Sequence, residues 1–202
     1  MKPEIFNCEQ GTPEWFACRL GIPTASRFKD VLAKGDGKTR KRYMLDLAGE
    51  RLTGECAEAY SNAHMERGQV MEAEARDLYV FMTDAEIERV GFIRNGDKGC
   101  SPDSLIGANG MVEIKTKLAA LQLECILADK LPPEHVAQVQ GALWVAEREW
   151  IDFVSYWPKL PLFVKRVYRD EDYIKNLAAE VGKFNSEMLE LIERIQPTRA
   201  AA

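Results

Sequence analysis

The sequence has little of what several protein classes require. It contains two histidines, and its five cysteines are widely spaced with no C-x-x-C pair. This argues against zinc and iron–sulfur sites and against a disulfide framework. No apolar run approaches the roughly 18 residues of a membrane-spanning helix, and the start MKPEIFNCEQ lacks the apolar segment of a signal peptide. We therefore expect a cytoplasmic protein with reduced cysteines and no membrane partner, and we expect His64 and His135 on helix surfaces.

Positive charge is also scarce, and the net charge is −5. Nonspecific binding of nucleic acid depends on many Lys and Arg contacts to phosphate, so any DNA contact here must use local positive charge. One basic cluster runs from Lys34 to Arg42, and it is open to two interpretations, a phosphate-binding segment or a solvated loop at a helix start. An acidic protein can still act on nucleic acid where its carboxylates hold metal ions.

The length of 202 residues and the hydrophobic fraction of 46% fit one globular domain over residues 1–202. The patterns predict an α/β or α+β chain that begins with helices. Helices are expected at residues 12–33 in two pieces, 39–52, 62–81 with Asn62 as N-cap, 118–131, 135–147 and 172–195. Strands are expected at residues 150–157 and 163–169, and turn sequences at 95–97 and 107–110 predict an antiparallel meander of three strands within residues 86–117.

Two acids and a lysine meet on this predicted meander. Asp103 is expected on its second strand, and Glu113 and Lys115 share one face of its third strand because residues two apart point the same way. The connecting turn makes Asp103 and Glu113 cross-strand neighbours. Two carboxylates about 4 Å apart repel by roughly 4 kcal/mol at an effective dielectric near 20. The pair is therefore expected to bind a cation.

Mg²⁺ fits such a pair, because it binds through one or two carboxylates and keeps several waters. The ammonium of Lys115 can hold an attacking water and stabilise charge that develops on phosphorus. Glu72 lies on an otherwise small or apolar face of helix 62–81. Its carboxylate could belong to the same site, or it could pair with a buried arginine or reach the surface.

The spacing of Asp103, Glu113 and Lys115 is that of the PD-(D/E)xK nuclease superfamily. Five blocks in order resemble the phage lambda exonuclease and YqaJ-type viral recombinase family. These are WFACRLGIPTAS at 15–26, RGQVMEAEAR at 67–76, CSPD at 100–103, EIK at 113–115 and AQVQ at 137–140.

The resemblance implies an α/β PD-(D/E)xK core, with a central mixed sheet flanked by helices. It implies a Mg²⁺-dependent 5′-to-3′ exonuclease that acts on double-stranded DNA ends, releases mononucleotides and leaves a 3′ tail for recombination. It further implies a homotrimer ring, a single-strand annealing protein as partner, and phage or prophage origin in a bacterial cytoplasm. Two alternatives stay open, an endonuclease of the same superfamily and an inactive DNA-binding recombination adaptor.

The resemblance also assigns roles to residues. Asp103, Glu113, the Ile114 carbonyl and Glu72 would bind the metal, with Mn²⁺ able to replace Mg²⁺. Lys115 would be the catalytic lysine. Gln138, rather than Gln140, would contact the nucleophilic water or its ligands.

Arg19 and Ser26 match family positions that hold the 5′-terminal phosphate, and Ser101 could add a hydroxyl. The family has a further arginine after the E-x-K strand, whereas residues 118–131 contain none. Lys117 or Lys130 could replace it, or recognition could rest on Arg19 alone.

Overall fold

The computed structural model of the chain describes residues 2–34, 37–56 and 63–200, with the backbone path alone for 63–69 and 196–200. Its α-helices are α1 (Pro13–Arg19), α2 (Phe28–Val31), α3 (Lys38–Thr53), α4 (Ala63–Thr83), α5 (Ala119–Ala128), α6 (Val136–Ala146) and α7 (Glu171–Ala200). Two 3-10 helices are η1 (Ala25–Arg27) and η2 (Pro133–His135). The strands are β1 (Glu4–Phe6), β2 (Ile87–Glu88), β3 (Phe92–Asn95), β4 (Lys98–Cys100), β5 (Ser104–Ile106), β6 (Gly110–Thr116), β7 (Trp150–Tyr156) and β8 (Phe163–Tyr168).

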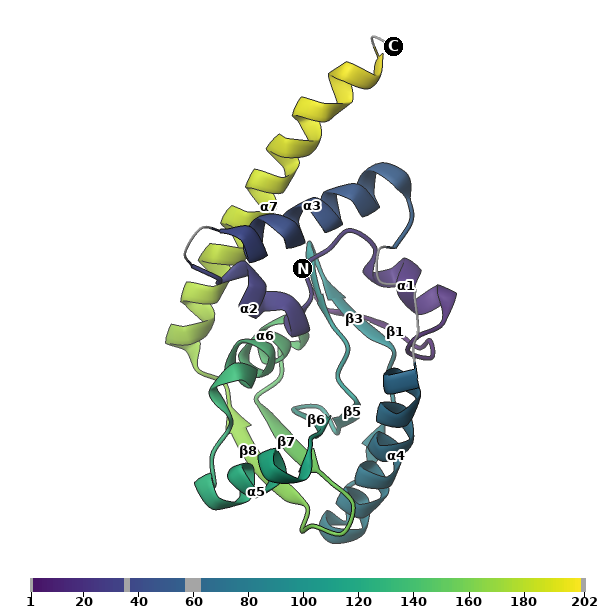
Figure 1. The fold of residues 1–202 in the computed structure, drawn as a ribbon, viewed down its shortest axis with the longest axis vertical. Helices are drawn as coiled ribbons and strands as arrows, with labels where there is room; N and C mark the ends of the chain where they lie inside the picture. Colours follow the sequence, from purple (N-terminus) through teal and green to yellow (C-terminus); the bar gives the residue numbers. More distant parts are fainter. Residues whose placement is uncertain (1, 35–36, 57–62, 201–202) are drawn as a thin grey trace.

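A five-stranded mixed sheet forms the centre of the fold, with strand order β2-β5-β6-β7-β8. Strands β6 and β7 are parallel, and the other pairs in this sheet are antiparallel. Helix α4 packs on one face, and α5 and α6 contact the sheet from the other (Figure 1). This arrangement confirms the expected mixed sheet flanked by helices.

The two faces of β6 show why the sheet needs both layers. Val112 and Ile114 point toward α4, where they join a buried apolar cluster with Ala75 and Tyr79. Met111 belongs to the larger core on the opposite face, which also contains residues of α2, α3, α6 and α7. The alternation of the strand therefore places Glu113 on the α6 side.

The predicted helices are confirmed to within a few residues at their ends. Thr12 caps α1 through its hydroxyl, which accepts a hydrogen bond from the Trp15 N–H at 3.4 Å. Gly21 has a φ of +67° and separates α1 from η1 and α2 as expected. The proposed N-cap Asn62 lies outside the described residues. Helix α7 packs against α3 and extends beyond the body of the protein (Figure 1).

Two expectations about the strands are wrong. The chain does not begin with a helix, because β1 pairs antiparallel with β3. The three-strand meander is also wrong, since β3 and β4 join β1 in a second, three-stranded sheet. The chain crosses to the central sheet at residues 101–103, where Pro102 has no N–H to continue a strand ladder. Asp103 therefore lies in the break before β5 and not on a strand.

His135 is a further correction, because its side chain is only 17% exposed. It packs against Phe153 of β7, with ring centroids 5.1 Å apart, instead of facing water. All five cysteines are free, as expected. Among the described helices, none has the length and apolar character to cross a membrane.

Candidate active site

A cleft of about 320 Å³ opens where η1, the β4–β5 break, β6, α4 and α6 meet. Every residue that the sequence assigned to the site contributes to its lining. These residues are Arg19, Ser26, Glu72, Ser101, Asp103, Glu113, Ile114, Lys115 and Gln138. Chain segments separated by more than a hundred residues in sequence thus form one site.

Backbone hydrogen bonds fix Asp103 beside the strand that carries Glu113. The Asp103 N–H donates to the Val112 carbonyl at 3.1 Å, which extends the β5–β6 ladder by one residue. One carboxylate oxygen of Asp103, Oδ2, accepts a hydrogen bond from the Ile114 N–H at 2.5 Å. In a strand, the N–H and C=O of one residue point to the same edge, so the Ile114 carbonyl faces the Asp103 side.

Glu113 is the most enclosed acid of the cleft, with a side chain 5% exposed. Its Oε1 accepts from Lys115 Nζ at 2.6 Å and from Gln138 Nε2 at 2.5 Å. Gln140 points elsewhere, because it bonds the Tyr168 carbonyl and the Asp170 N–H. Gln138 therefore lines the cleft and Gln140 does not.

Burial and neighbouring charges shift the pKa values of ionisable groups in the cleft. Burial, followed by the charges of Glu113 and Glu72, raises the pKa of Asp103 well above its usual value. Burial alone would lower the pKa of Lys115, but the charges of Glu113 and Asp103 outweigh it and raise that pKa. The acids thus favour the protonated, positively charged form of Lys115.

Glu72 combines the two interpretations that the sequence left open. It lines the cleft beside Asp103, and its Oε1 also accepts a hydrogen bond from Arg76, one helical turn later. Arg76 is largely buried, with a side chain 11% exposed. The carboxylate is therefore held at the rim of the site by an ion pair within α4.

The donor set of the cleft fits Mg²⁺. It consists of carboxylate oxygens and one carbonyl, and burial next to other acids makes the charged form of Asp103 costly without a cation. In the described part of the chain, no three His, Cys, Asp or Glu side chains stand close enough to enclose a metal. Such an open set matches an ion that keeps several waters.

Hydroxyl and guanidinium groups also line the cleft. The Arg19 guanidinium lies over the Trp15 ring, 4.1 Å from its centroid. The Trp15 indole N–H donates to Ser101 Oγ at 3.0 Å, which ties α1 to the residue two before Asp103. Ser26 Oγ is 3.2 Å from the hydroxyl of Thr24 and is exposed to the cleft.

A glycine brings η1 close to the helix that carries Gln138. A Cβ at Gly141 would lie 2.3 Å from the ring of Phe28, so only glycine permits this approach of α6 to the start of α2. The close packing places Ser26 and Gln138 in the same cleft.

Sequence reasoning missed Arg27, which also lines the cleft. Its guanidinium lies 4.4 Å from the centroid of the Tyr43 ring, and its Nε donates to Asp30 at 2.5 Å. The signal was present, because Arg27 directly follows the phosphate candidate Ser26. The direction in which the Arg27 side chain points could not be predicted from its position in the sequence.

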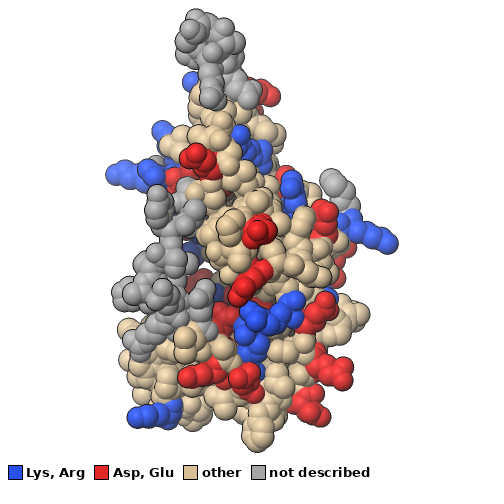
Figure 2. Space-filling view, turned by 90° about the vertical axis from the view of Figure 1, so that its right-hand side faces the viewer, with Lys and Arg blue, Asp and Glu red and all other residues tan. Residues whose placement is uncertain are grey.

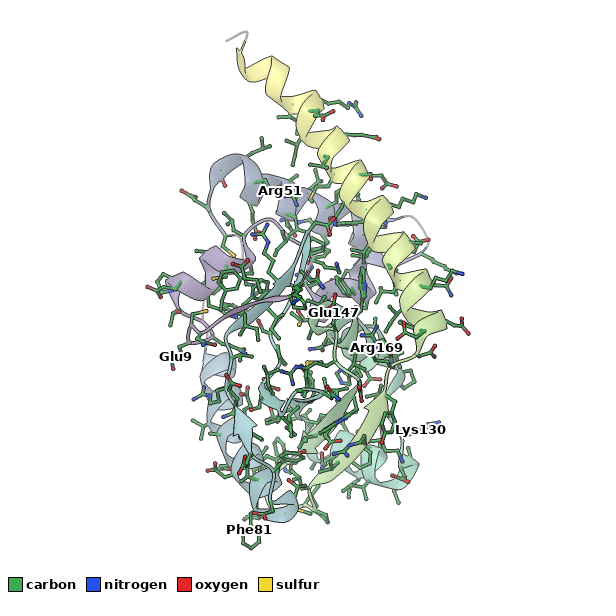
Figure 3. All side chains as sticks on the ribbon, turned by 180° about the vertical axis from the view of Figure 1, so that it is seen from behind. Glu9, Arg51, Phe81, Lys130, Glu147 and Arg169 are labelled. Carbon is green, nitrogen blue, oxygen red and sulfur yellow. The ribbon has the colours of Figure 1, made fainter. Side chains whose placement is uncertain are left out.

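The proposed substitutes for the missing arginine do not line this cleft. Lys117 and Lys130 border a different depression beside α5, and Lys117 Nζ is bound to His135 and Glu134. Lys130 lies near the end of α5, on the opposite side of the fold from α4 (Figure 3).

The basic cluster that begins at Lys34 also lies outside the cleft lining. Arg40 pairs with Glu187 and Arg42 with Asp46, so these members stabilise helices.

The chain matches the family described as YqaJ-like viral recombinase domain over residues 14–149. It belongs to this family. A comparison with curated proteins gives no match.

Solved structures agree with this membership. The alkaline exonuclease LHK-Exo from Laribacter hongkongensis is 38% identical, covers 94% of this chain and 99% of its own, and has a TM-score of 0.86. Its complex with dAMP gives a TM-score of 0.87 at the same identity and coverage. A phage related exonuclease from Haemophilus somnus is 15% identical, covers 86% of this chain and 96% of its own, and shares the fold with a TM-score of 0.65. By family and by its PD-(D/E)xK fold, this YqaJ-like chain is a nuclease of the exonuclease type.

Proposed function

We propose that this protein is a Mg²⁺-dependent exonuclease that degrades one strand of linear double-stranded DNA from its 5′ end. It releases mononucleotides and leaves a 3′ single-stranded tail. The observation that carries the proposal is one cleft that is lined both by carboxylates with a lysine and by arginines with hydroxyls. The similarity to an alkaline exonuclease, and to its complex with a deoxynucleoside monophosphate, supports the same activity and product class here.

The acids of the cleft, Lys115 and Gln138 would each have a separate role in hydrolysis. Asp103, Glu113 and the Ile114 carbonyl would hold Mg²⁺, with Glu72 joining from α4. The bound ion would lower the pKa of a water and polarise a phosphoryl oxygen. Lys115, 2.6 Å from Glu113, is placed to orient the attacking water and to stabilise charge that develops on the phosphate. Gln138 holds the Glu113 carboxylate in place through its amide.

The arginines and hydroxyls of the cleft supply a reason for attack at a strand end. Arg19 and Arg27 present guanidinium groups, and Ser26 and Ser101 present hydroxyls, all within one cleft. Guanidinium and hydroxyl donors suit a terminal phosphate, which has one more anionic oxygen than a phosphodiester. In this proposal Arg27 replaces the family arginine that residues 118–131 lack.

Several wider properties belong to the same proposal and rest on the family resemblance. They are a homotrimer ring that encloses DNA, a single-strand annealing protein as partner, a role in phage-type recombination, and a cytoplasmic setting in a bacterial host. Mn²⁺ is expected to replace Mg²⁺. The chain is taken as one domain over residues 1–202.

Digestion of matched DNA substrates tests the activity. We expect linear duplex with a 5′-phosphate to be degraded in the presence of Mg²⁺, a 5′-hydroxyl duplex to be degraded more slowly, and circular plasmid to stay intact. Chelation by EDTA should stop the reaction. Cutting of circular DNA would favour an endonuclease and would contradict the proposed exonuclease activity, which needs a DNA end.

Arg27 is tested by the preference for a 5′-phosphate. Arg27→Gln should lower the ratio of kcat/KM for 5′-phosphate over 5′-hydroxyl duplex about tenfold, which corresponds to roughly 1.4 kcal/mol. Lys130→Gln serves as a matched control, because this exposed lysine lies outside the cleft. An unchanged ratio in Arg27→Gln would leave end recognition to Arg19.

A further inference from the structure

A second cleft, of about 580 Å³, adjoins the catalytic one. Gln10, Glu72 and Asp103 line both clefts and form the wall between them. The Gln10 amide is fixed there, because its Nε2 donates to the Pro102 carbonyl at 3.3 Å. The two clefts therefore meet at Glu72 and Asp103.

The second cleft has its own positive charge. Arg76 and Arg89 both line it, together with Asn7 from the N-terminal segment. Arg76 is bound to Glu72 through one guanidinium nitrogen, while its buried Nε has no hydrogen-bond partner among the described residues. Arg89 is exposed and makes no ion pair with any residue that the structure describes. Both arginines thus keep hydrogen-bond donors for a ligand.

The surface around this cleft mixes charges of both signs. Strand β1 and helix α4 lie on the side of the molecule that Figure 2 presents, where Lys or Arg side chains sit at the middle of the face among Asp and Glu. Glu9 also lines the cleft, and it points outward at the edge of the molecule (Figure 3). The acids of the dividing wall would repel an anion on their own, so the arginines determine where an anion can bind.

We propose that the second cleft binds the phosphate that follows the scissile one on the degraded strand, with Arg89 and Arg76 as its ligands. This inference rests on the proposed function. A strand whose terminal phosphate lies at Arg19 and Ser26, and whose first linkage lies at Asp103 and Glu113, must place its next linkage beyond Asp103. Past Asp103, the DNA strand can continue into the adjoining cleft, which is lined by Arg76 and Arg89.

The occupancy of this cleft also bears on Glu72. Arg76 neutralises Glu72 before substrate binds, and a phosphate at Arg76 would compete with that carboxylate for the guanidinium. Glu72 would then be released toward the metal when the strand is in place. Arg89 is the cleaner residue to test, because Arg76 is paired with Glu72, whereas Arg89 makes no ion pair with any residue that the structure describes.

The experiment combines one substitution with one change in the DNA. The probes are 5′-phosphorylated linear duplexes whose degraded strand carries either normal linkages or a neutral methylphosphonate at the second linkage. Initial cleavage by the wild type and by Arg89→Gln is measured with Mg²⁺ to give kcat and KM. Arg94→Gln is the control, since Arg94 is an exposed arginine on β3 that lines neither cleft.

We expect the methylphosphonate to raise the wild-type KM about five- to tenfold, with kcat changed less than about twofold, as for loss of one charged contact. Arg89→Gln should raise KM by a similar factor on normal DNA and should show little further loss on the modified DNA. Its affinity should also depend less steeply on salt, with the slope reduced by about one. Arg94→Gln should behave as the wild type.

Additive effects of the substitution and the modified linkage, or a normal KM and salt slope for Arg89→Gln, would overturn the assignment of the second cleft. A wild-type protein that fails to degrade unmodified linear duplex would instead overturn the proposed function. The two failures are therefore distinct.

Discussion

Asp152 and Glu113 lie on opposite faces of the β6–β7 strand pair, and their surroundings differ in how completely the carboxylates are paired. Asp152 of β7, 3% exposed, faces α4. It accepts two hydrogen bonds from Arg166, at 2.9 and 2.8 Å, and one from the Tyr79 hydroxyl at 2.7 Å. Glu113 of β6 faces α6, and it shares its cleft with Asp103 and Glu72.

The difference separates a structural acid from the acids that we propose to be catalytic. The hydrogen bonds and charge of Asp152 raise the pKa of Arg166, as expected for a stable ion pair. In the cleft, Lys115 pairs with Glu113 and Arg76 with Glu72, whereas Asp103 forms no ion pair with a residue that the structure describes. Burial, followed by the charges of Glu113 and Glu72, raises the pKa of Asp103. Such incomplete pairing is typical of a site where a ligand supplies the missing charge.

The largest expected effect is on activity, at Asp103. Asp103→Asn should lower the rate of DNA cleavage about 10⁴-fold, because it removes a metal ligand without changing the size of the side chain. The thermal midpoint should stay the same or rise, since one repelling charge is removed. Cleavage of linear duplex and thermal unfolding without metal provide the two measurements. Loss of DNA binding together with activity would show that Asp103 has a structural role instead.

The opposite result is expected at Asp152. Asp152→Ala should lower the free energy of unfolding by about 2–3 kcal/mol, because it removes the hydrogen bonds to the carboxylate from the buried Tyr79 hydroxyl and from Arg166. Tyr79→Phe is the matched control, and it should cost only about 1 kcal/mol because the Arg166 pair remains. Urea unfolding measures both. If Asp152→Ala keeps wild-type stability, the contacts of Asp152 with Arg166 and Tyr79 do not stabilise the fold.

The stabilisation of the folded protein by Mg²⁺ should distinguish Asp103 from Asp152. Mg²⁺ at about 100 times its dissociation constant should stabilise the wild type by roughly 2.7 kcal/mol, since it binds the folded chain. The same addition should stabilise Asp152→Ala by a similar amount and Asp103→Asn hardly at all. Thermal unfolding with and without Mg²⁺ is the measurement. Equal stabilisation of all three proteins would place the metal elsewhere.

Much of the fold could be predicted from the sequence, because its signals are local. The amphipathic patterns of α3, α4 and α7 and the apolar runs of β7 and β8 depend on residues close together in the chain. The short strand β1 lacked such a signal, since its three residues become a strand only by pairing with β3. The break at residues 101–103 was also missed, because a strand that changes sheets has the same alternation as a continuous one.

The site shows the same division. Glu113 and Lys115 could be predicted to point together from strand geometry, and the neighbouring position of Asp103 followed from one turn. Arg27, Arg76 and Arg89 could not be predicted to border the clefts, because their positions depend on packing of η1, α4 and the β2–β3 connection against distant segments.

His135 offers the smallest effect and a third way to bury an ionisable group, which is to remain neutral. Burial, followed by the charges of Lys117 and Lys115, lowers its pKa from 6.5 to about 4. Between these values the unfolded chain binds a proton that the folded chain does not, so stability falls as the pH drops from 6.5 toward 4. When the pH falls from 7.5 to 5.0, the titration of His135 should lower the free energy of unfolding by about 2 kcal/mol.

His135→Gln keeps an acceptor for Lys117 and should lose less stability over this range than the wild type, as urea unfolding at the two pH values would show. Equal losses in both proteins would mean that His135 is protonated in the folded state, and its contact with Phe153 would then not keep it neutral.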